Sequence, residues 1–361
     1  FKFNNSGWSP KNINMKNRRK FLKNSALLGT GFFIVPRNVL GGPGFISPSD
    51  QLNIAAIGAG GKGYDITDKW ASGERVIALC DVHPDKKDVL NARKKYPNAN
   101  VYVDFREMLD NEKDLDAVTV STPDHTHGII ASNAMNRGLH AYVQKPLTHN
   151  IEEARKLTQI AKKNKVVTQM GNQGGSSTGV VKIQEWVDKK MIGKIHKIYA
   201  WTNRPVWPQG FPMEDRSEDK PVNLNWDLWL GPASYTKYTS QLHPFNWRGW
   251  WDYGTGALGD MGCHILDAPY KTLGLHYPTD VECSVGSVFQ QAWSQNFIPE
   301  GCPPSSIVTL HFEKTKKNDS KIQLVWMDGG LRPNHPEDIP ADDYLGEVNS
   351  TNGVLMIGEK G

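Results

Sequence analysis

The stretch LNIAAIGAGGKG, residues 52–63, decides how the rest of this 361-residue chain is interpreted. A short, mostly apolar run ends at Gly58, which is typical of a buried strand, and a helical pattern starts near Gly63. The glycines between them fit the pattern G-x-G-x-x-G. In that pattern Gly58 allows a tight turn, Gly60 (next to Gly61) lets the backbone approach a diphosphate, and Gly63 packs the helix against the strand. Between a strand and a helix, this loop predicts a dinucleotide site.

An acidic residue closes the next predicted strand, RVIALCD at 75–81. This residue, Asp81, lies 18 positions beyond Gly63, where a carboxylate that binds ribose hydroxyls is expected. A carboxylate accepts hydrogen bonds from both hydroxyls but repels a 2′-phosphate. The sequence therefore predicts NAD as the cofactor in preference to NADP.

Predicted strands and helices alternate as far as Gly171, which predicts a doubly wound parallel sheet of the Rossmann type. Beyond Gly171 the pattern changes to helices near 178–190 and 259–273 and to several runs of period two. These runs predict a C-terminal α+β domain with a mostly antiparallel, open sheet. The strands of the first part are expected at 52–58, 75–81, 100–104, 116–122, 139–144 and 165–170.

The segment NRRKFLK, residues 17–23, places two arginines before an apolar run of 11 residues, Ser25–Val35. That run is too short to span a bilayer but has the length of a signal-peptide core. A twin-arginine signal addresses folded proteins to an exporter, which suits an enzyme whose nicotinamide cofactor is loaded in the cytoplasm. We therefore expect a periplasmic protein with tightly bound NAD, exported by the twin-arginine machinery and tethered to the membrane if the signal is not cleaved.

Basic charge is concentrated in the first of three predicted parts of the chain. These parts are the signal and linker at 1–50, the NAD-binding Rossmann domain at 51–172 and the substrate-binding α+β domain at 173–361. The formal net charge is +4, but residues 1–50 hold eight of the 42 basic and one of the 38 acidic side chains. Because the remainder is weakly acidic, the sequence predicts no nucleic-acid partner.

Two motifs follow predicted parallel strands, at the edge of the sheet where such folds bind their ligands. TPDHTH at 122–127 follows the fourth strand, and QKP at 144–146 follows the fifth. Both are expected to flank the nicotinamide. Moving a hydride off a carbinol carbon requires stabilisation of an alkoxide-like oxygen, which Lys145 can provide. A lone lysine is otherwise most often a solvated surface residue.

The run GTGALGDMGCHILD, 254–267, offers Asp260, His264 and Asp267 at spacings of four and three, on one face of a predicted helix. A histidine held by a carboxylate one turn away is a natural proton acceptor. Such a pair can equally be structural or merely exposed. One histidine with flanking acids is a poor ligand set, so we predict no metal.

Together these motifs resemble the Gfo/Idh/MocA family (glucose–fructose oxidoreductase / inositol dehydrogenase), from about Leu52 to the C-terminus. The resemblance implies an NAD-dependent oxidoreductase that acts on a hydroxyl of a sugar, polyol or related carbohydrate. It places Lys145 at the catalytic lysine position and Asp260 with His264 at the catalytic dyad. Seven tryptophans between 201 and 251 favour a lined cleft. The implied cofactor contacts are Thr122, Pro123, His127 and Gln144, and the implied sugar-pocket residues are Arg204, Trp207, Arg248 and Tyr253.

The chain departs from the family pattern at two places. Gln144 stands where the family usually has glutamate, which removes a charge beside Lys145. The chain ends at GVLMIGEKG, where family members continue, so we expect part of the second domain to be missing. Two other functions stay open: a redox-neutral, NAD-dependent glycoside hydrolase and a non-catalytic sugar-binding protein. Self-association into homo-oligomers is an expectation from relatives.

Overall fold

The computed structural model describes residues 47, 50–214, 218–295, 297–347 and 351–361. The predicted export signal lies outside these residues. The chain divides into a unit that ends at Gln51 and a unit Leu52–Gly361, and the architecture below belongs to the second unit. No helix in the described part of the chain has both the length and the apolar character needed to cross a bilayer.

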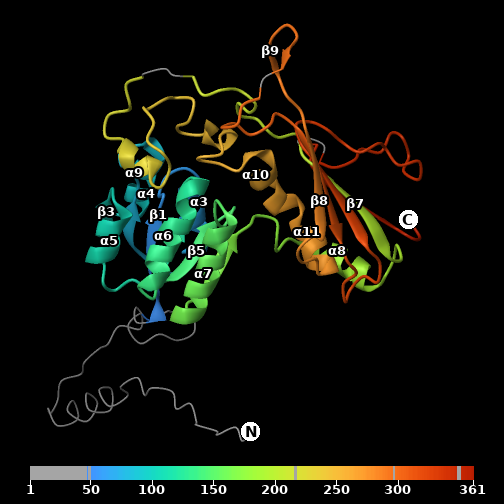
Figure 1. Ribbon diagram of the computed structural model, residues 1–361. Helices are drawn as coiled ribbons and strands as arrows, with labels where there is room; N and C mark the ends of the chain where they lie inside the picture. Colours follow the sequence, from blue (N-terminus) through green and yellow to red (C-terminus); the bar gives the residue numbers. More distant parts are fainter. Residues whose placement is uncertain (1–46, 48–49, 215–217, 296, 348–350) are drawn as a thin grey trace, which may run out of the picture. The chain divides into compact units, whose positions relative to one another are not determined.

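A sheet of six parallel strands forms the N-terminal domain, in the order β3-β2-β1-β4-β5-β6 (Figure 1). The order reverses between β1 and β4, which is the doubly wound arrangement that the alternating pattern predicts. All five strand pairings are parallel. This confirms the first half of the predicted fold class. The strands are β1 (Asn53–Ile57), β2 (Arg75–Cys80), β3 (Asn100–Tyr102), β4 (Ala117–Val120), β5 (His140–Gln144) and β6 (Thr168–Gly171).

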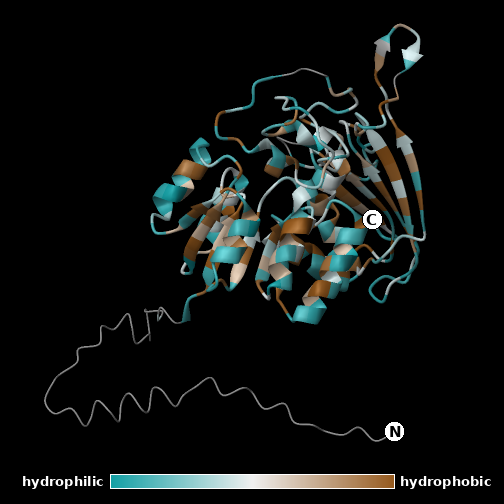
Figure 2. Ribbon diagram, turned by 60° about the vertical axis from the view of Figure 1, so that its left-hand side comes forward, coloured by the Kyte–Doolittle hydropathy of each residue, from teal (hydrophilic) through white to brown (hydrophobic). Residues whose placement is uncertain are grey.

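Helices cover both faces of this sheet, so its central strands are apolar on both sides. Ala55, Ala78 and Val118, from three neighbouring strands, have no exposed surface. Figure 2 shows apolar strands between helices whose outer faces are hydrophilic. The helices are α3 (Lys62–Trp70), α4 (Lys87–Lys95), α5 (Phe105–Asn111), α6 (Asp124–Asn136) and α7 (Ile151–Asn164).

The second domain is built on a five-stranded sheet in the order β13-β7-β12-β11-β8. Only β7 and β12 pair in parallel, and the other three pairings are antiparallel, which confirms the predicted mostly antiparallel sheet. Three helices pack on one face of it, seen in Figure 1 beside the sheet. These elements are β7 (Ile195–Trp201), β8 (Asp280–Val285), β11 (Ser306–Phe312), β12 (Ile322–Met327), β13 (Gly353–Gly358), α8 (Thr178–Asp188), α10 (Gly256–Ile265) and α11 (Asp267–Leu273). A small hairpin, β9 (Phe289–Gln291) and β10 (Ser294–Gln295), extends from β8.

The predicted helix at 259–273 is two helices that meet at Leu266. Pro269 explains the break, because a proline inside a continuous helix would lack its N–H and would clash with the carbonyl of Ile265. In the first turn of α11 the same proline is tolerated. The break turns the chain between the segment that carries His264 and the helix that covers the sheet.

Most of the tryptophans between 201 and 251 belong to the core, and two of them, Trp229 and Trp247, also line the cavity described below, so the predicted tryptophan-lined cleft is found only in part. Six of the seven are buried, and only Trp251 is exposed, at 46%. Several pack together around α9 (Trp226–Leu230) and the short 3-10 helix η2 (Asn246–Gly249), with Trp226 stacked on Trp229 at 4.5 Å between ring centroids. The physical reason is that this long segment has few regular elements and needs its own apolar cluster to be ordered.

Candidate active site

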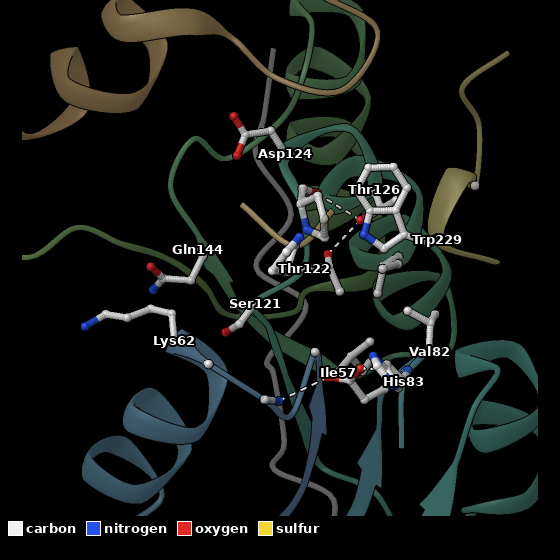
Figure 3. Close-up of a pocket in the computed structure, with 18 of the residues that line it drawn as sticks. Ile57, Lys62, Val82, His83, Ser121, Thr122, Asp124, Thr126, Gln144 and Trp229 are labelled. Atoms are coloured by element: carbon white, nitrogen blue, oxygen red, sulfur yellow. Dashed lines mark hydrogen bonds between the residues drawn. The ribbon is translucent and has the colours of Figure 1, made fainter. Parts of the chain in front are cut away.

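A cavity of about 600 Å³ lies at the carboxyl ends of β1, β2, β4 and β5 (Figure 3). The strand order of the sheet reverses at this place, and such a reversal is where doubly wound sheets bind their ligands. Residues of the second domain complete the wall, from α9, η2 and the helix that carries His264. The predicted residues that line it are Gly58, Gly60, Gly61, Asp81, Thr122, Pro123, Gln144, Lys145, Arg248 and His264.

The glycine-rich loop is too tight for side chains at Gly58, Gly60 and Gly63. Gly58 has a φ of 75°, and a Cβ there would lie 2.7 Å from the backbone of Ser121. A Cβ on Gly63 would lie 1.7 Å from the carbonyl oxygen of Gly58, so the start of α3 packs directly on the end of β1. The loop therefore presents its backbone to the cavity, as binding of a diphosphate requires.

Replacing Gly63 by alanine is expected to displace this loop, because the new methyl group overlaps a backbone oxygen. We expect a loss of about 1–3 kcal/mol in the free energy of unfolding and a marked weakening of NAD binding. Thermal unfolding with and without NAD measures both. Gly179→Ala is the matched control, since a Cβ there meets only Ser177 Oγ, at 3.7 Å. Unchanged NAD binding in Gly63→Ala would contradict the predicted role of the loop.

Asp81 is held in place at the end of β2 by two backbone N–H groups. Gly60 donates to Oδ2 at 3.1 Å and His83 donates to Oδ1 at 3.0 Å. Burial raises the pKa of Asp81, while these hydrogen bonds and the nearby Lys86 act in the opposite direction. The carboxylate lies beside the glycine loop, where it can accept from ribose hydroxyls.

Two further polar atoms in the wall of the cavity are available to a ligand. Ser121 Oγ and His83 Nδ1 are buried and have no hydrogen-bond partner within the described part of the chain. Buried polar groups are normally paired, so such atoms indicate a missing partner. With the glycine loop and Asp81, these donors and acceptors fit a dinucleotide.

Lys145, at the end of β5, makes an ion pair with Asp260 of the second domain. Its Nζ donates to Asp260 Oδ1 at 2.5 Å and to the Asp260 carbonyl oxygen at 3.0 Å, and Arg248 Nε lies 3.4 Å from the same carboxylate. Burial alone raises the pKa of Asp260, but the two cations outweigh it and lower the pKa below its ordinary value. Asp260 lies behind Lys145 and outside the cavity wall, so it positions the lysine.

His264 lines the cavity, but no carboxylate in the described part of the chain hydrogen bonds to it. Its Nδ1 lies 3.2 Å from the carbonyl oxygen of Gln173. Asp260 is paired with Lys145 instead, and Asp267 is paired with Lys271 at 2.8 Å. The prediction that a carboxylate one turn away orients His264 is therefore wrong. An ammonium stabilises a partly buried carboxylate more than a neutral imidazole does.

The carbonyl of Gln173 sets the tautomer of His264 in place of a carboxylate. A proton on Nδ1 donates to this oxygen, which leaves Nε2 with a lone pair that can accept a proton. Burial, followed by the charge of Lys145, lowers the pKa of His264 below its ordinary value. The imidazole is therefore neutral near pH 7, as a proton acceptor must be.

His127 does not line the cavity, which corrects its predicted cofactor contact. Its ring nitrogens lie 2.7 Å from the carbonyl oxygens of Thr122 and Pro146. His127, which α6 carries, thereby links the segments that follow β4 and β5, and it is almost completely buried. Gln144 does line the cavity, and Gly171 makes room for it, because a Cβ there would lie 2.0 Å from Gln144 Nε2.

Of the four predicted sugar-pocket residues, only Arg248 lines the cavity. Its guanidinium packs on aromatic rings, with Trp247 at 4.1 Å and Trp207 at 5.8 Å from the ring centroid, so Trp207 supports it from behind. Tyr253 is a core residue that is 2% exposed, and Arg204 donates to Asn203 Oδ1 outside the wall. Arg204, Trp207 and Tyr253 do not line this cavity, because position in a long loop says nothing about the direction of a side chain, and their contact with a sugar stays a prediction.

Sequence reasoning missed Asp124, the first residue of α6. It lines the cavity, is only 5% exposed and accepts from Thr255 Oγ1 at 3.0 Å. Burial raises its pKa, and the charges of His127, Lys145 and Arg248 oppose this effect. Its place inside TPDHTH was the one available indication. Other residues of the wall that the sequence did not single out include Lys62, Ser121, Gln173 and His243.

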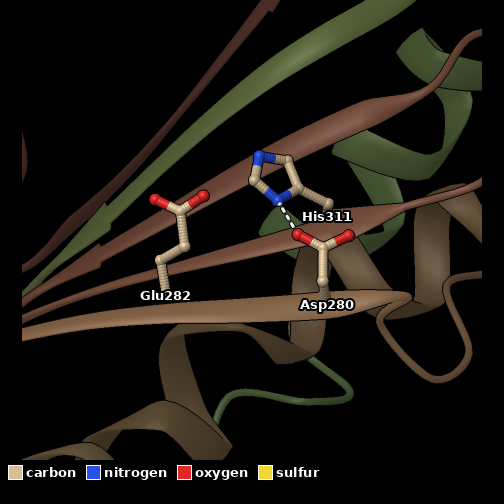
Figure 4. A group of neighbouring side chains, drawn as sticks. All are labelled: Asp280, Glu282 and His311. Atoms are coloured by element: carbon tan, nitrogen blue, oxygen red, sulfur yellow. Dashed lines mark hydrogen bonds and ion pairs between the residues drawn. The ribbon is translucent and has the colours of Figure 1, made fainter.

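A group of side chains with metal-binding chemistry lies away from the cavity, on β8 and β11 (Figure 4). It consists of Asp280, Glu282 and His311, and both acids are exposed. His311 Nδ1 lies 2.5 Å from Asp280 Oδ1, directly opposite it in the strand pairing. Two members of the group, Asp280 and His311, therefore already hydrogen bond to each other at the surface. The absence of a metal site stays a prediction.

The fold and the site are those of a two-domain dinucleotide-binding protein. A doubly wound sheet carries the glycine-rich loop, and a second α/β domain supplies Asp260 and His264. Residues 52–172 match a model described as an oxidoreductase family with an NAD-binding Rossmann fold. Residues 177–294 match the C-terminal α/β domain of the same oxidoreductase family. The chain belongs to the Gfo/Idh/MocA family of NAD(P)-dependent oxidoreductases.

This chain is similar to two distant relatives whose activities differ from each other. A levoglucosan dehydrogenase of Pseudarthrobacter phenanthrenivorans is 22% identical over 313 residues, which cover 84% of this chain and 66% of that protein. An α-N-acetylgalactosaminidase of Shewanella oneidensis is 28% identical over 215 residues, which cover 56% of this chain and 44% of that protein. The chain thus spans less than two thirds of either relative.

Among solved structures, a myo-inositol dehydrogenase from Lactobacillus casei, in complex with NAD(H) and myo-inositol, has the same fold. Its TM-score is 0.53 at 20% identity, and the match covers 86% of this chain and 73% of that chain. At this level of identity the likeness concerns the fold alone.

Proposed function

We propose that this protein is an NAD-dependent oxidoreductase that acts on a hydroxyl of a sugar, polyol or related carbohydrate. One observation carries the proposal. Lys145 and His264, from different domains, line the same cavity as the glycine-rich loop and Asp81. A cation and a neutral imidazole beside a dinucleotide site are what oxidation of a carbinol needs.

Each residue of the site has a separate role in this reaction. NAD, held by the glycine loop and Asp81, supplies a hydride acceptor when it is bound. Lys145 stabilises the developing negative charge on the substrate oxygen, and its ion pair with Asp260 keeps the ammonium in position. His264 takes the hydroxyl proton at Nε2, since Nδ1 is directed to the Gln173 carbonyl.

A second candidate is a redox-neutral glycoside hydrolase, in which a sugar hydroxyl is oxidised transiently and the hydride is returned. The similarity to an α-N-acetylgalactosaminidase favours it. The same residues serve this reaction, because the first step is again removal of a hydroxyl proton with stabilisation of the oxygen. A non-catalytic sugar-binding protein is the third alternative, and the paired Lys145 and Asp260 argue against it.

We further propose that the protein is exported folded by the twin-arginine route, on the basis of NRRKFLK at 17–23. A cofactor that is loaded in the cytoplasm and cannot be replaced outside it has to be bound tightly and regenerated in place. Fractionation of cells that make the Arg18→Lys, Arg19→Lys variant tests this, with loss of the periplasmic protein as the expected result.

The deciding experiment uses protein purified without added cofactor. It is incubated with a panel of sugars, polyols and aryl glycosides, while reduced-nicotinamide absorbance and release of the aglycone are followed together. NADH that accumulates, or that is consumed by a second carbonyl substrate, without glycoside cleavage supports the oxidoreductase. Aglycone release without net change in bound NAD supports the glycosidase. Neither signal, in protein that binds no nucleotide, refutes both.

The pH dependence of turnover should report the lowered pKa of His264. A base works in its neutral form, and the pKa of this imidazole is below the ordinary histidine value of about 6.5. We therefore expect the acid limb of the kcat/KM profile to have its midpoint below that ordinary value. A pH–rate profile checks this, and an acid limb with a midpoint above 6.5 would contradict His264 as the base in this environment.

A further inference from the structure

The segment that leads into α10, residues 253–255, is held by side chains of the Rossmann domain. Each of its three residues contacts a different side chain of that domain. The contacts are Tyr253 O with His125 Nδ1 at 3.2 Å, Gly254 O with His149 Nε2 at 3.3 Å and Thr255 Oγ1 with Asp124 Oδ2 at 3.0 Å. Asp124 and His125 begin α6, and His149 lies between β5 and α7. The start of α10 is therefore fixed by the chain that follows β4 and β5.

Of these three contacts, the one between Thr255 and Asp124 is made by a side chain at both ends. Asp124 is only 5% exposed, so loss of the threonine hydroxyl would leave a buried carboxyl group without this hydrogen bond. The hydroxyl also lies close against the first turn of α10, because a Cβ on Gly259 would lie 2.1 Å from Thr255 Oγ1. The hydrogen bond thus joins the first residue of α6 directly to α10.

Helix α10 carries both second-domain residues of the proposed mechanism. Asp260 pairs with Lys145 across the boundary between the domains, and His264 lines the cavity. Because both lie on one helix of ten residues, a shift at its start moves both relative to Lys145. A displacement of about 1 Å at an active site can cost about 10²-fold in rate. The contact that fixes the start of α10 therefore matters for the chemistry.

We propose that Asp124 is a positioning residue, which acts through Thr255 to hold α10 beside Lys145. This inference rests on the proposed function, because it takes Lys145 and His264 as the residues that act on the substrate. Asp124 lies in the wall of the cavity, but Thr255 does not. The hydroxyl of Thr255 can therefore affect turnover only through the position of α10, which separates this role from direct contact with cofactor or substrate.

Thr255→Val tests the proposal, because it removes the hydroxyl, keeps the branched shape of the side chain and leaves the cavity wall unchanged. We expect kcat to fall by about 10- to 100-fold, with KM and NAD binding changed by less than about threefold. Thr255→Ser keeps the hydroxyl and should retain most of the activity. The matched control is Thr272→Val. Thr272 has no exposed surface, and its Oγ1 donates to the Ala268 carbonyl at 2.7 Å within α11, so this variant should lose stability but keep kcat.

The substrate-free protein gives a second readout, the titration of His264 followed by NMR. Burial and the charge of Lys145 lower the pKa of this imidazole. If α10 moves away from Lys145, the pKa of His264 should rise toward its ordinary value in Thr255→Val and stay unchanged in Thr272→Val. A loss of stability alone would not produce this difference between the two variants.

Two results would overturn the positioning role while leaving the proposed function intact. One is a kcat of Thr255→Val equal to that of wild type or lowered no more than in Thr272→Val. The other is a loss of activity in Asp124→Asn without a loss in Thr255→Val, because Asp124 would then act directly. Wild-type protein that binds no NAD and turns over no substrate would instead overturn the proposed function, and the titration of His264 would still decide whether Thr255 positions α10.

Discussion

Lys145→Met is expected to lower kcat by about 10³-fold or more while the protein still binds NAD. Methionine keeps the unbranched stem of lysine but has no charge to stabilise the developing oxyanion, and loss of such a group costs about 10²–10³-fold. The Lys145–Asp260 pair also orders the two domains relative to each other, and losing it lowers kcat further. Steady-state kinetics on the best substrate of the panel, with NAD binding followed separately, measures the effect.

The double variant Lys145→Met, Asp260→Asn controls for stability. In the single variant, Asp260 is left with Arg248 as its cationic neighbour, and breaking a buried pair costs up to about 3 kcal/mol. Neutralising both partners should recover much of this stability, as thermal unfolding would show. If the double variant is stable but as inactive as the single one, the loss lies in the chemistry. Full activity of Lys145→Met would remove the lysine from the mechanism and favour a non-catalytic sugar-binding protein.

His264→Ala is expected to lower kcat by about 10²–10⁴-fold, the range for loss of a general base. Binding of NAD should change little, because His264 belongs to the second-domain side of the cavity. The acid limb of the pH–rate profile should disappear together with the imidazole. A purely structural role of His264 would leave that limb in place. His276→Ala, at an exposed position, is the control and should behave as wild type.

Partial rescue by added imidazole would strengthen the assignment, since the cavity left by the side chain can admit it. If His264→Ala retained both its rate and its pH profile, another group would have to take the proton. Asp124, the other titratable side chain close to Lys145 in the wall, would then be the next candidate.

The Rossmann half of the fold follows from short-range patterns. The apolar runs that predict strands, the glycines at 58–63 and Asp81 are all found where the sequence indicates them. The helices that the sequence did not predict correctly are short or interrupted. The seven residues of α5 are too few to show helical periodicity, although Asp104 accepts from Arg106 N as an N-cap. Pro269 splits the helix expected at 259–273.

The cofactor side of the site was predictable because it sits on one loop and on strand ends, whose order in the sheet places them together. The substrate side of the site was less predictable. His264 was identified by its residue type and helical spacing, yet its partner is the Gln173 carbonyl, 91 residues away. Periodicity gives the face of a helix on which a side chain lies, but it does not say what is packed against that face.

By itself, the sequence determined the fold class, the dinucleotide loop and the position of Lys145 at the end of a parallel strand, because each depends on neighbours within one strand–loop–helix unit. The tertiary structure decided that Asp260 pairs with Lys145, 115 positions away, and that Arg248 and not Arg204 or Tyr253 faces the cavity. It also decided that most of these tryptophans form a core, with Trp229 and Trp247 in the wall of the cavity. These outcomes depend on how two domains pack, since a buried charge takes the partner that packing brings closest.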